Sequence, residues 1–260
     1  METLDIFTRA ASLHAVERFW WATEVVFRCF DFAATLSWAL SGAVLAARRG
    51  HDLTGIFAIA LVSSCGGGLL RDAVFLQAGP PALVRSPAYL LIALLAALGT
   101  WLLGAVPFGR WQRSLGRAAT VLDALGLGAF AVVGTRLALA ASIGVVGALL
   151  IGVVNAVGGG LLRSLLLRQA PEVLAPGKLT ALAAFAGTVV YALLSLLLGV
   201  EEVWAGGVSI ALVAALRGAS LRYGLSTRAV WSVEARKRFR RELVARTSSI
   251  TWRAPHPRAR

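Results

Sequence analysis

The sequence predicts an all-α membrane protein with seven transmembrane helices, built as two inverted three-helix repeats plus a seventh helix. The 260 residues are 58% hydrophobic and only 15% charged, which is too apolar for a soluble domain. Residues 31–71 recur as residues 123–163, at a constant offset of 92 positions. Basic residues also accumulate in alternate connections between the apolar segments, as they do in multi-pass membrane proteins.

The repeat aligns without a gap. Asp31 corresponds to Asp123, and Gly42 corresponds to Gly134. Its clearest part is a shared run, Gly66-Gly67-Gly68-Leu69-Leu70-Arg71 in the first copy and Gly158-Gly159-Gly160-Leu161-Leu162-Arg163 in the second. Each copy holds three apolar spans, an odd number, so equivalent helices must cross the membrane in opposite directions about a pseudo-two-fold axis in its plane.

Segments of about 20 apolar residues are long enough to cross a bilayer as helices. They predict spans at residues 29–47, 53–78, 87–106, 120–140, 142–168, 179–198 and 203–220. The second and fifth spans contain the glycine triplets, and we expect each to be broken into two half-helices. The chain then divides into an N-terminal amphipathic extension (1–28), repeat 1 (29–106), a cytoplasmic linker (107–119), repeat 2 (120–198), helix 7 (199–220) and a basic cytoplasmic tail (221–260).

The N-terminal extension mixes apolar, aromatic and charged residues. It is typical of an interfacial amphipathic helix, either separate from the first span or continuous with it. Glu2 and Asp5 stand where a signal peptide would carry basic residues, so no cleaved signal is expected. The two cysteines, Cys29 and Cys65, lie in apolar segments and predict neither a disulfide framework nor a metal site.

The positive-inside rule orients the chain. The connections after spans 1, 3 and 5 carry two or three Lys or Arg each. The connection after span 2 holds Arg85 alone, the one after span 4 has no Lys or Arg, and the one after span 6 holds Glu201 and Glu202. We therefore expect the N-terminus outside and the C-terminus in the cytoplasm. Twelve of the 26 Lys and Arg lie in residues 217–260 against two acids, which gives this region +10 of the total charge of +13. The favoured interpretation is a tail lying near anionic lipid headgroups. Nucleic-acid binding is the alternative, but the tail has no recognised nucleic-acid motif, and no such partner is predicted.

The glycine triplets are the most informative feature for function. A glycine inside a helix costs about 1 kcal/mol relative to alanine, so six of them in apolar segments need a reason. One reason is a kink at Gly66, Gly67 and Gly68 and at Gly158, Gly159 and Gly160, which would expose backbone carbonyls to a cation pathway. The alternative is close packing of helix backbones, and the two are compatible. Polar residues directly before the triplets are the candidate pathway lining: Ser63, Ser64 and Asn155.

Arg71 and Arg163 follow the triplets by three residues. A charge at membrane depth indicates function by default, so these arginines line a pathway, snorkel to the interfaces, or pair with Asp31 or Asp123. Adjacent positions of a helix do not face each other, so Arg71 is not expected to bond its neighbour Asp72.

Three more charged residues are candidates. Asp31 and Asp123 start the first span of each repeat, as N-terminal caps or as carboxylates that concentrate cations at a mouth. Arg136 is the only basic residue within the fourth span, and is either a gating or voltage-sensing charge or an interfacial arginine. The three histidines are dispersed, and no phosphate-binding loop occurs. We therefore predict no enzyme activity, no metal and no cofactor.

Several short motifs recur along the chain: Asp31, Gly42, Ala46-Ala47-Arg48, Asp52-Leu53-x-Gly55, Asp123-Ala124-Leu125-Gly126-Leu127 and the two GGGxxR elements. Together they form a pattern that resembles the prokaryotic trimeric intracellular cation (TRIC) channel family. The resemblance covers residues 29–220. It implies a homotrimer in a prokaryotic plasma (inner) membrane, in which each protomer holds its own pore, lined largely by the kinked second and fifth helices. It also implies conduction of monovalent cations, potassium before sodium. One departure is Ser164, which stands where the commoner family pattern has Asp after the second Arg.

The same domain family has also been labelled a transporter of small amino acids, particularly glycine. A secondary transporter of that kind usually needs a titratable carboxylate at mid-membrane, whereas Asp31, Asp72 and Asp123 lie near the starts of spans or half-helices, which favours the channel. A third alternative is a membrane scaffold that acts through its basic tail.

Overall fold

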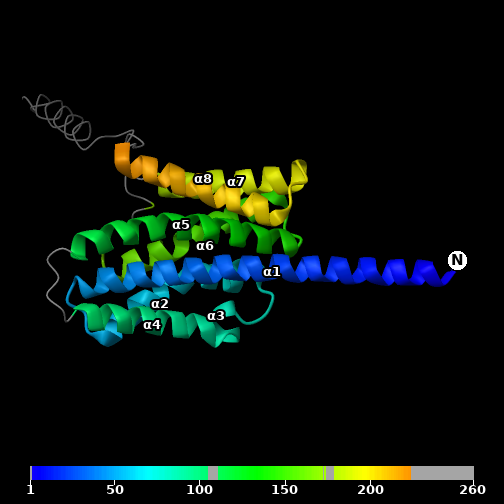
Figure 1. The fold of residues 1–260 in the computed structure, drawn as a ribbon. Coiled ribbons are helices and arrows are strands. Elements are labelled where there is room, and N and C mark those ends of the chain that lie inside the picture. Colours follow the sequence, from blue (N-terminus) through cyan, green and yellow to red (C-terminus); the bar gives the residue numbers. More distant parts are fainter. Residues whose placement is uncertain (1, 105–110, 172, 174–178, 224–260) are drawn as a thin grey trace, which may run out of the picture.

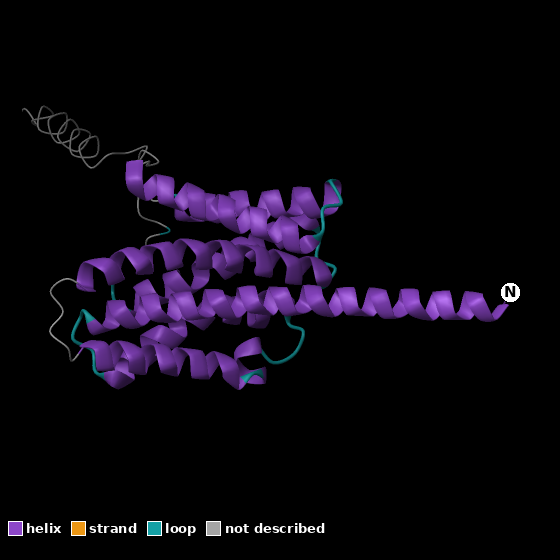
Figure 2. Ribbon diagram, viewed as in Figure 1, coloured by secondary structure: helices purple, strands orange, loops and turns teal. Residues whose placement is uncertain are grey.

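The computed structural model of the protein describes residues 2–104, 111–171, 173 and 179–223, with side chains from Trp21 onward except those of 104–119. All regular structure in these residues is helical (Figure 2). The elements are α1 (Glu2–Ala47), α2 (Leu53–Leu70), a π-helix η1 (Arg71–Leu76), α3 (Ala82–Arg85), α4 (Pro87–Gly104), α5 (Trp111–Ala140), α6 (Val145–Leu166), α7 (Thr180–Ala192), a second π-helix η2 (Leu193–Leu197) and α8 (Glu202–Tyr223).

Within the described residues, six segments are long and apolar enough to cross a membrane: Trp21–Ala47, Leu53–Leu76, Thr120–Ala140, Val145–Leu166, Thr180–Leu197 and Glu202–Tyr223. A shorter apolar helix covers Pro87–Leu103. The prediction of an all-helical membrane protein is confirmed, and a helix occupies each of the seven predicted ranges. That all seven cross the bilayer stays a prediction.

Some element boundaries differ from the predicted ones. The first helix runs without interruption from Glu2 to Ala47, so the N-terminal extension is continuous with the first span and projects beyond the bundle (Figure 1). The helix α5 begins at Trp111, inside the predicted linker. The predicted tail, residues 221–260, lies outside the described residues except for its first three.

The helices form two groups joined at a central contact. In one group α1, α2 and α4 pack on each other, and in the other α5 and α6 pack with α7 and α8 (Figure 1). The groups meet where α2 packs on α6 and α1 packs on α5. The four helices α1, α2, α5 and α6 therefore make the centre of the molecule.

The glycine triplets are the point where α2 and α6 cross. A Cβ atom added to Gly67 would lie 2.0 Å from the carbonyl oxygen of Asn155, and one added to Gly159 would lie 2.0 Å from the carbonyl oxygen of Ser63. These two contacts are related by the 92-residue offset of the repeat. Only glycine allows backbones to approach this closely, so the close-packing interpretation holds.

The prediction that both helices break at the triplets is wrong, because both helices run through them. The helix α2 continues to Leu70, and α6 continues to Leu166. Backbone contact with the neighbouring helix replaces the side-chain packing that glycine lacks, so the helical hydrogen bonds are kept. The irregular part comes after the first triplet, where η1 begins at Arg71.

A second pair of glycines completes the crossing. A Cβ atom on Gly42 of α1 would meet Ser63 Oγ at 2.3 Å, and one on Gly134 of α5 would meet Asn155 Cβ at 2.7 Å. Each polar residue before a triplet is thus packed against a glycine of the first helix of its own repeat. This contact holds the side chains of Ser63 and Asn155 inside the four-helix centre.

We expect Gly67→Ala and Gly159→Ala each to destabilise the protein by about 3 kcal/mol, the upper end of the cost of overpacking, because the new methyl group meets a backbone oxygen that cannot move aside. The matched control is Gly207→Ala in α8, where a Cβ atom would meet nothing within 4 Å and helix propensity favours alanine. Thermal unfolding of the purified variants in detergent measures the difference. Equal melting temperatures for all three variants would contradict the crossing described above.

Candidate functional site

The side chains of Ser63 and Asn155 form the centre of the candidate site. They are 0% and 1% exposed, and neither Ser63 Oγ nor Asn155 Oδ1 has a hydrogen-bond partner in the part of the chain that the structure describes. The Asn155 amide nitrogen donates to the Phe130 carbonyl at 2.7 Å, which orients the amide oxygen. Buried polar atoms without partners are rare and indicate a site for water or an ion. By contrast, Ser64 Oγ donates to the Ala60 carbonyl of its own helix at 2.9 Å.

A large cavity opens on one side of this centre, at the end of the bundle that holds the connections 77–81 and 141–144. It measures about 620 Å³, and we call it the vestibule. Its lining comes from α1, η1, α4, α5 and the segment between η1 and α4. The charged groups of the lining are four guanidiniums and three carboxylates, those of Arg28, Arg71, Arg85, Arg136, Glu24, Asp31 and Asp72.

A small hollow of about 20 Å³ continues from the vestibule toward the α2–α6 crossing. It shares Asp31, Arg71, Asp72 and Tyr89 with the vestibule and reaches Gly68. The point where a Cβ atom of Gly68 would lie is 4.0 Å from Asn155 Oδ1. The small hollow thus extends from the vestibule to the neighbourhood of the unpartnered amide oxygen of Asn155.

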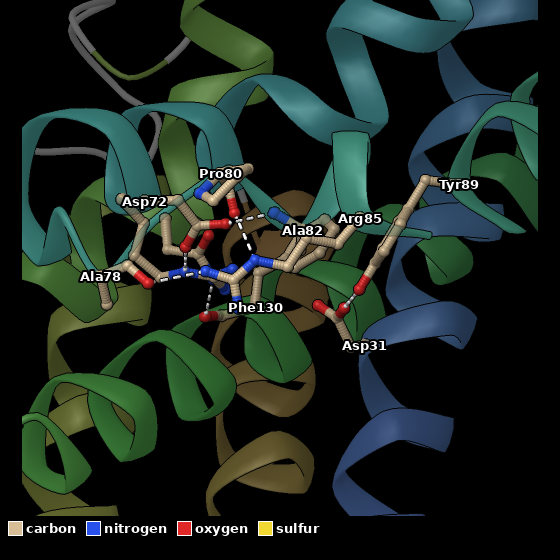
Figure 3. A network of polar contacts seen from close by, with 10 residues as sticks. Asp31, Asp72, Ala78, Pro80, Ala82, Arg85, Tyr89 and Phe130 are labelled. Carbon is tan, nitrogen blue, oxygen red and sulfur yellow. Dashed lines mark hydrogen bonds and ion pairs between the residues drawn. The ribbon is translucent and has the colours of Figure 1, made fainter. Parts of the chain in front are cut away.

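The carboxylate of Asp31 faces Tyr89 of α4, and the tyrosine hydroxyl donates a hydrogen bond to it (Figure 3). The cap interpretation of Asp31 and Asp123 is wrong, because both lie inside helices that begin much earlier, at Glu2 and Trp111. A carboxylate within an apolar span needs a partner, and Tyr89 is one that the sequence pattern did not reveal.

The expectation that Arg71 and Asp72 do not bond is also wrong. Arg71 Nε donates to Asp72 Oδ1 at 2.7 Å, and Arg71 is only 4% exposed. The other oxygen of Asp72 accepts the backbone N–H of Ala82 at 2.9 Å (Figure 3). The long side chain of Arg71 folds back to the carboxylate of the next residue, which the Ala82 N–H of α3 also holds in place.

Arg136 joins three helices at the side of the vestibule. Its Nε donates to Glu202 at 2.8 Å, its Nη1 donates to Glu24 at 3.1 Å, and its guanidinium lies 4.3 Å from the ring centroid of Phe27. It thus ties α5 to α8 and α1. Because Arg136 is paired with two carboxylates, it links the three helices to one another. A gating role stays a prediction.

A second hollow of about 20 Å³ lies on the other side of the crossing, toward the connection between α6 and α7. Asp123, Arg163 and Arg217 line it. Arg217 Nη1 donates to Thr180 Oγ1 at 2.6 Å, and its Nη2 lies 3.7 Å from Asp123 Oδ2. Arg163 Nη1 donates to Ser41 Oγ at 3.1 Å.

Sequence reasoning missed Arg217, because it lies in α8, outside the repeat, and was counted with the basic tail. The apolar run directly before it was the available signal that this arginine is buried. Among the described residues, no group of three His, Cys, Asp or Glu side chains is placed to hold a metal ion.

This arrangement can be compared with known proteins. A family model described as glycine transporter matches residues 28–105 and 120–196. The TRIC channel orthologue of Rhodobacter sphaeroides is 33% identical, and the superposition covers 77% of this chain and 99% of that one with a TM-score of 0.69. The chain belongs to the TRIC channel family. A further TRIC cation channel structure is 32% identical, with a TM-score of 0.68 over 78% of this chain and 96% of that one.

Curated relatives agree with this membership. A UPF0126 membrane protein of Deinococcus radiodurans is 35% identical over 55% of this chain and 64% of its own length. The inner membrane protein YadS of Escherichia coli is 34% identical over 55% of this chain and 67% of its own length. The alignments thus span about two thirds of these relatives. The protein is a multi-pass membrane protein with the fold of TRIC cation channels.

We expect Asp72→Ala to destabilise this TRIC family member by about 1–3 kcal/mol, because it takes the ion-pair partner from the buried Arg71 guanidinium and the acceptor from the Ala82 N–H. The matched control is Ser164→Ala at the equivalent position of the second repeat, whose hydroxyl bonds only the Gly160 carbonyl of its own helix; its expected cost is about 1 kcal/mol or less. Thermal unfolding in detergent compares the two. A larger loss for Ser164→Ala would contradict the ranking.

Proposed function

We propose that the protein is a homotrimeric channel for monovalent cations, chiefly potassium, with one pore in each protomer lined by α2 and α6. Membership of the TRIC family supports the cation channel. The observation that carries the pore position is the pair of buried oxygens, Ser63 Oγ and Asn155 Oδ1, that lack partners at the crossing. Oxygen ligands replace the hydration shell of potassium in channels, so unpartnered oxygens there suit a passing cation.

The proposed route runs from the vestibule through the hollow beside Asp31 to the crossing, and from there to the hollow beside Asp123. On this route Ser63, Ser64 and Asn155 line the narrow part. The six triplet glycines let α2 and α6 approach each other, so that the two oxygens come from equivalent positions. The buried arginines Arg71 and Arg163 lie on either side of the crossing, as pathway charges held by neighbouring side chains.

We propose the inverted orientation of the two repeats, with the N-terminus outside and the C-terminus in the cytoplasm of a prokaryotic cell. The reciprocal contacts of Gly67 with Asn155 and of Gly159 with Ser63 are those that a two-fold axis through the crossing would produce. The vestibule then opens outward, because the connections at its end of the bundle hold Glu201 and Glu202 with Arg85 as their one basic residue, while the opposite end carries Arg48, Arg49 and Arg168. The basic tail would lie near anionic headgroups.

Planar-bilayer recording of the purified protein, with potassium on one side and sodium on the other, tests this function. We expect unitary currents whose reversal potential shows that potassium permeates more readily than sodium. Asn155→Leu, which keeps the branching at Cγ but removes both polar atoms of the amide, should lower the unitary conductance about tenfold, the factor that matches ~1.4 kcal/mol of lost ion stabilisation. Gly207→Ala, on the outer face of α8, is the control that should conduct normally.

Two results would refute the proposal. Unitary currents that are the same in Asn155→Leu and in the unchanged protein would place the pore elsewhere. Absence of current, together with saturable glycine uptake by liposomes containing the protein, would favour the amino-acid transporter suggested by the family label. Light scattering in detergent tests the trimer, whose protein mass should be three times the 27.3 kDa of one chain.

A further inference from the structure

The two arginines that follow the glycine triplets have different counter-charges. Arg71 bonds the carboxylate of Asp72, the next residue. Arg163 is followed by Ser164, whose hydroxyl donates to the Gly160 carbonyl at 2.8 Å and carries no charge. The repeat therefore places a guanidinium at both positions but a neighbouring carboxylate at only one.

Arg163 is buried without an ion pair among the described residues. It is 8% exposed, its Nη1 donates to the neutral Ser41 hydroxyl, and its Nε has no partner. Asp123, the one carboxylate in the described lining of the same hollow, lies 3.7 Å from Arg217 Nη2. A buried charge without a partner costs several kcal/mol, so the native state gains if a counter-ion binds there.

The hollow beside Arg163 restricts what this counter-ion can be. It measures about 20 Å³, whereas one water molecule needs ~10–15 Å³ on such a scale. There is room for a single atom, and none for phosphate or an organic acid. Two guanidiniums, those of Arg163 and Arg217, line the hollow, and the ring of Trp38 closes one side with its centroid 5.7 Å from Arg163 Cζ.

We propose that a halide ion, chloride under ordinary conditions, binds at Arg163 Nε in this hollow and replaces the carboxylate that Ser164 lacks. Guanidinium is weakly hydrated and binds anions readily in buried places. The site itself follows from the burial and the missing carboxylate. The effect of this ion on conduction rests on the proposed channel function. When chloride balances the charge of Arg163, the guanidinium repels a cation leaving the crossing less strongly than it does without chloride.

Crystals grown with bromide in place of chloride test the site directly, because bromide gives an anomalous signal. We expect a peak within hydrogen-bonding reach of Arg163 Nε in the unchanged protein. Ser164→Asp supplies the missing carboxylate and should remove the peak. Ser164→Asn, similar in size but neutral, should keep it.

Two diffraction results would overturn the site. One is a hollow that is closed or holds only water or a carboxylate of this chain in the unchanged protein. The other is a peak that persists at full height in Ser164→Asp. The first of these results needs only the unchanged protein, so the test remains decisive even if a variant does not fold.

Conductance measurements test the effect of the bound halide on potassium conduction. Replacing chloride by gluconate, which is too large for the hollow, should lower the unitary potassium conductance about threefold or more in the unchanged protein, through repulsion by an uncompensated charge. It should have no effect in Ser164→Asp. A bromide peak with equal conductance in both salts would refute the electrostatic role. Absence of current in every protein would refute the channel function, while diffraction still decides the halide site.

Discussion

The contact between the backbones of α2 and α6 is the constraint on which the rest of the structure depends. Gly67 and Gly159 lie against the carbonyls of Asn155 and Ser63 so closely that no side chain fits. This approach brings equivalent residues of the two repeats to one point. It also excludes the side chains that would otherwise fill the centre, so two polar atoms stay buried without partners. The proposed pore is thus a consequence of how two helices pack.

The two sides of the crossing share a plan but differ in chemistry. On one side a wide vestibule leads to Asp31, which is held by Tyr89, and to Arg71, which is held by Asp72. On the other side a small hollow holds Asp123 with Arg217, a residue of the helix outside the repeat. The buried Arg71 of the first copy has a carboxylate beside it, whereas Arg163 of the second copy is followed by a serine.

Several errors of prediction have a common physical origin. The glycine triplets predicted broken helices, because glycine weakens an isolated helix, but packing against the partner helix preserves the hydrogen bonds. Asp31 and Asp123 looked like caps, since the apolar pattern starts near them, yet both helices begin earlier. Arg71 was not expected to reach Asp72, because adjacent positions of a helix point in different directions, but the long arginine side chain folds back and the Ala82 N–H of α3 holds the carboxylate. Each of these outcomes depends on a neighbour that the local sequence does not contain.

The sequence by itself determined the helical membrane fold, the duplication and the residues at the centre, including Ser63, Asn155 and both triplets. These features depend on apolar length and on a repeat at constant offset, and both are properties of the chain alone. Only the tertiary structure decided which partners the charged residues have: Tyr89 for Asp31, Glu24 and Glu202 for Arg136, and Arg217 for Asp123. These partners come from helices far apart in sequence, and packing in three dimensions brings them together.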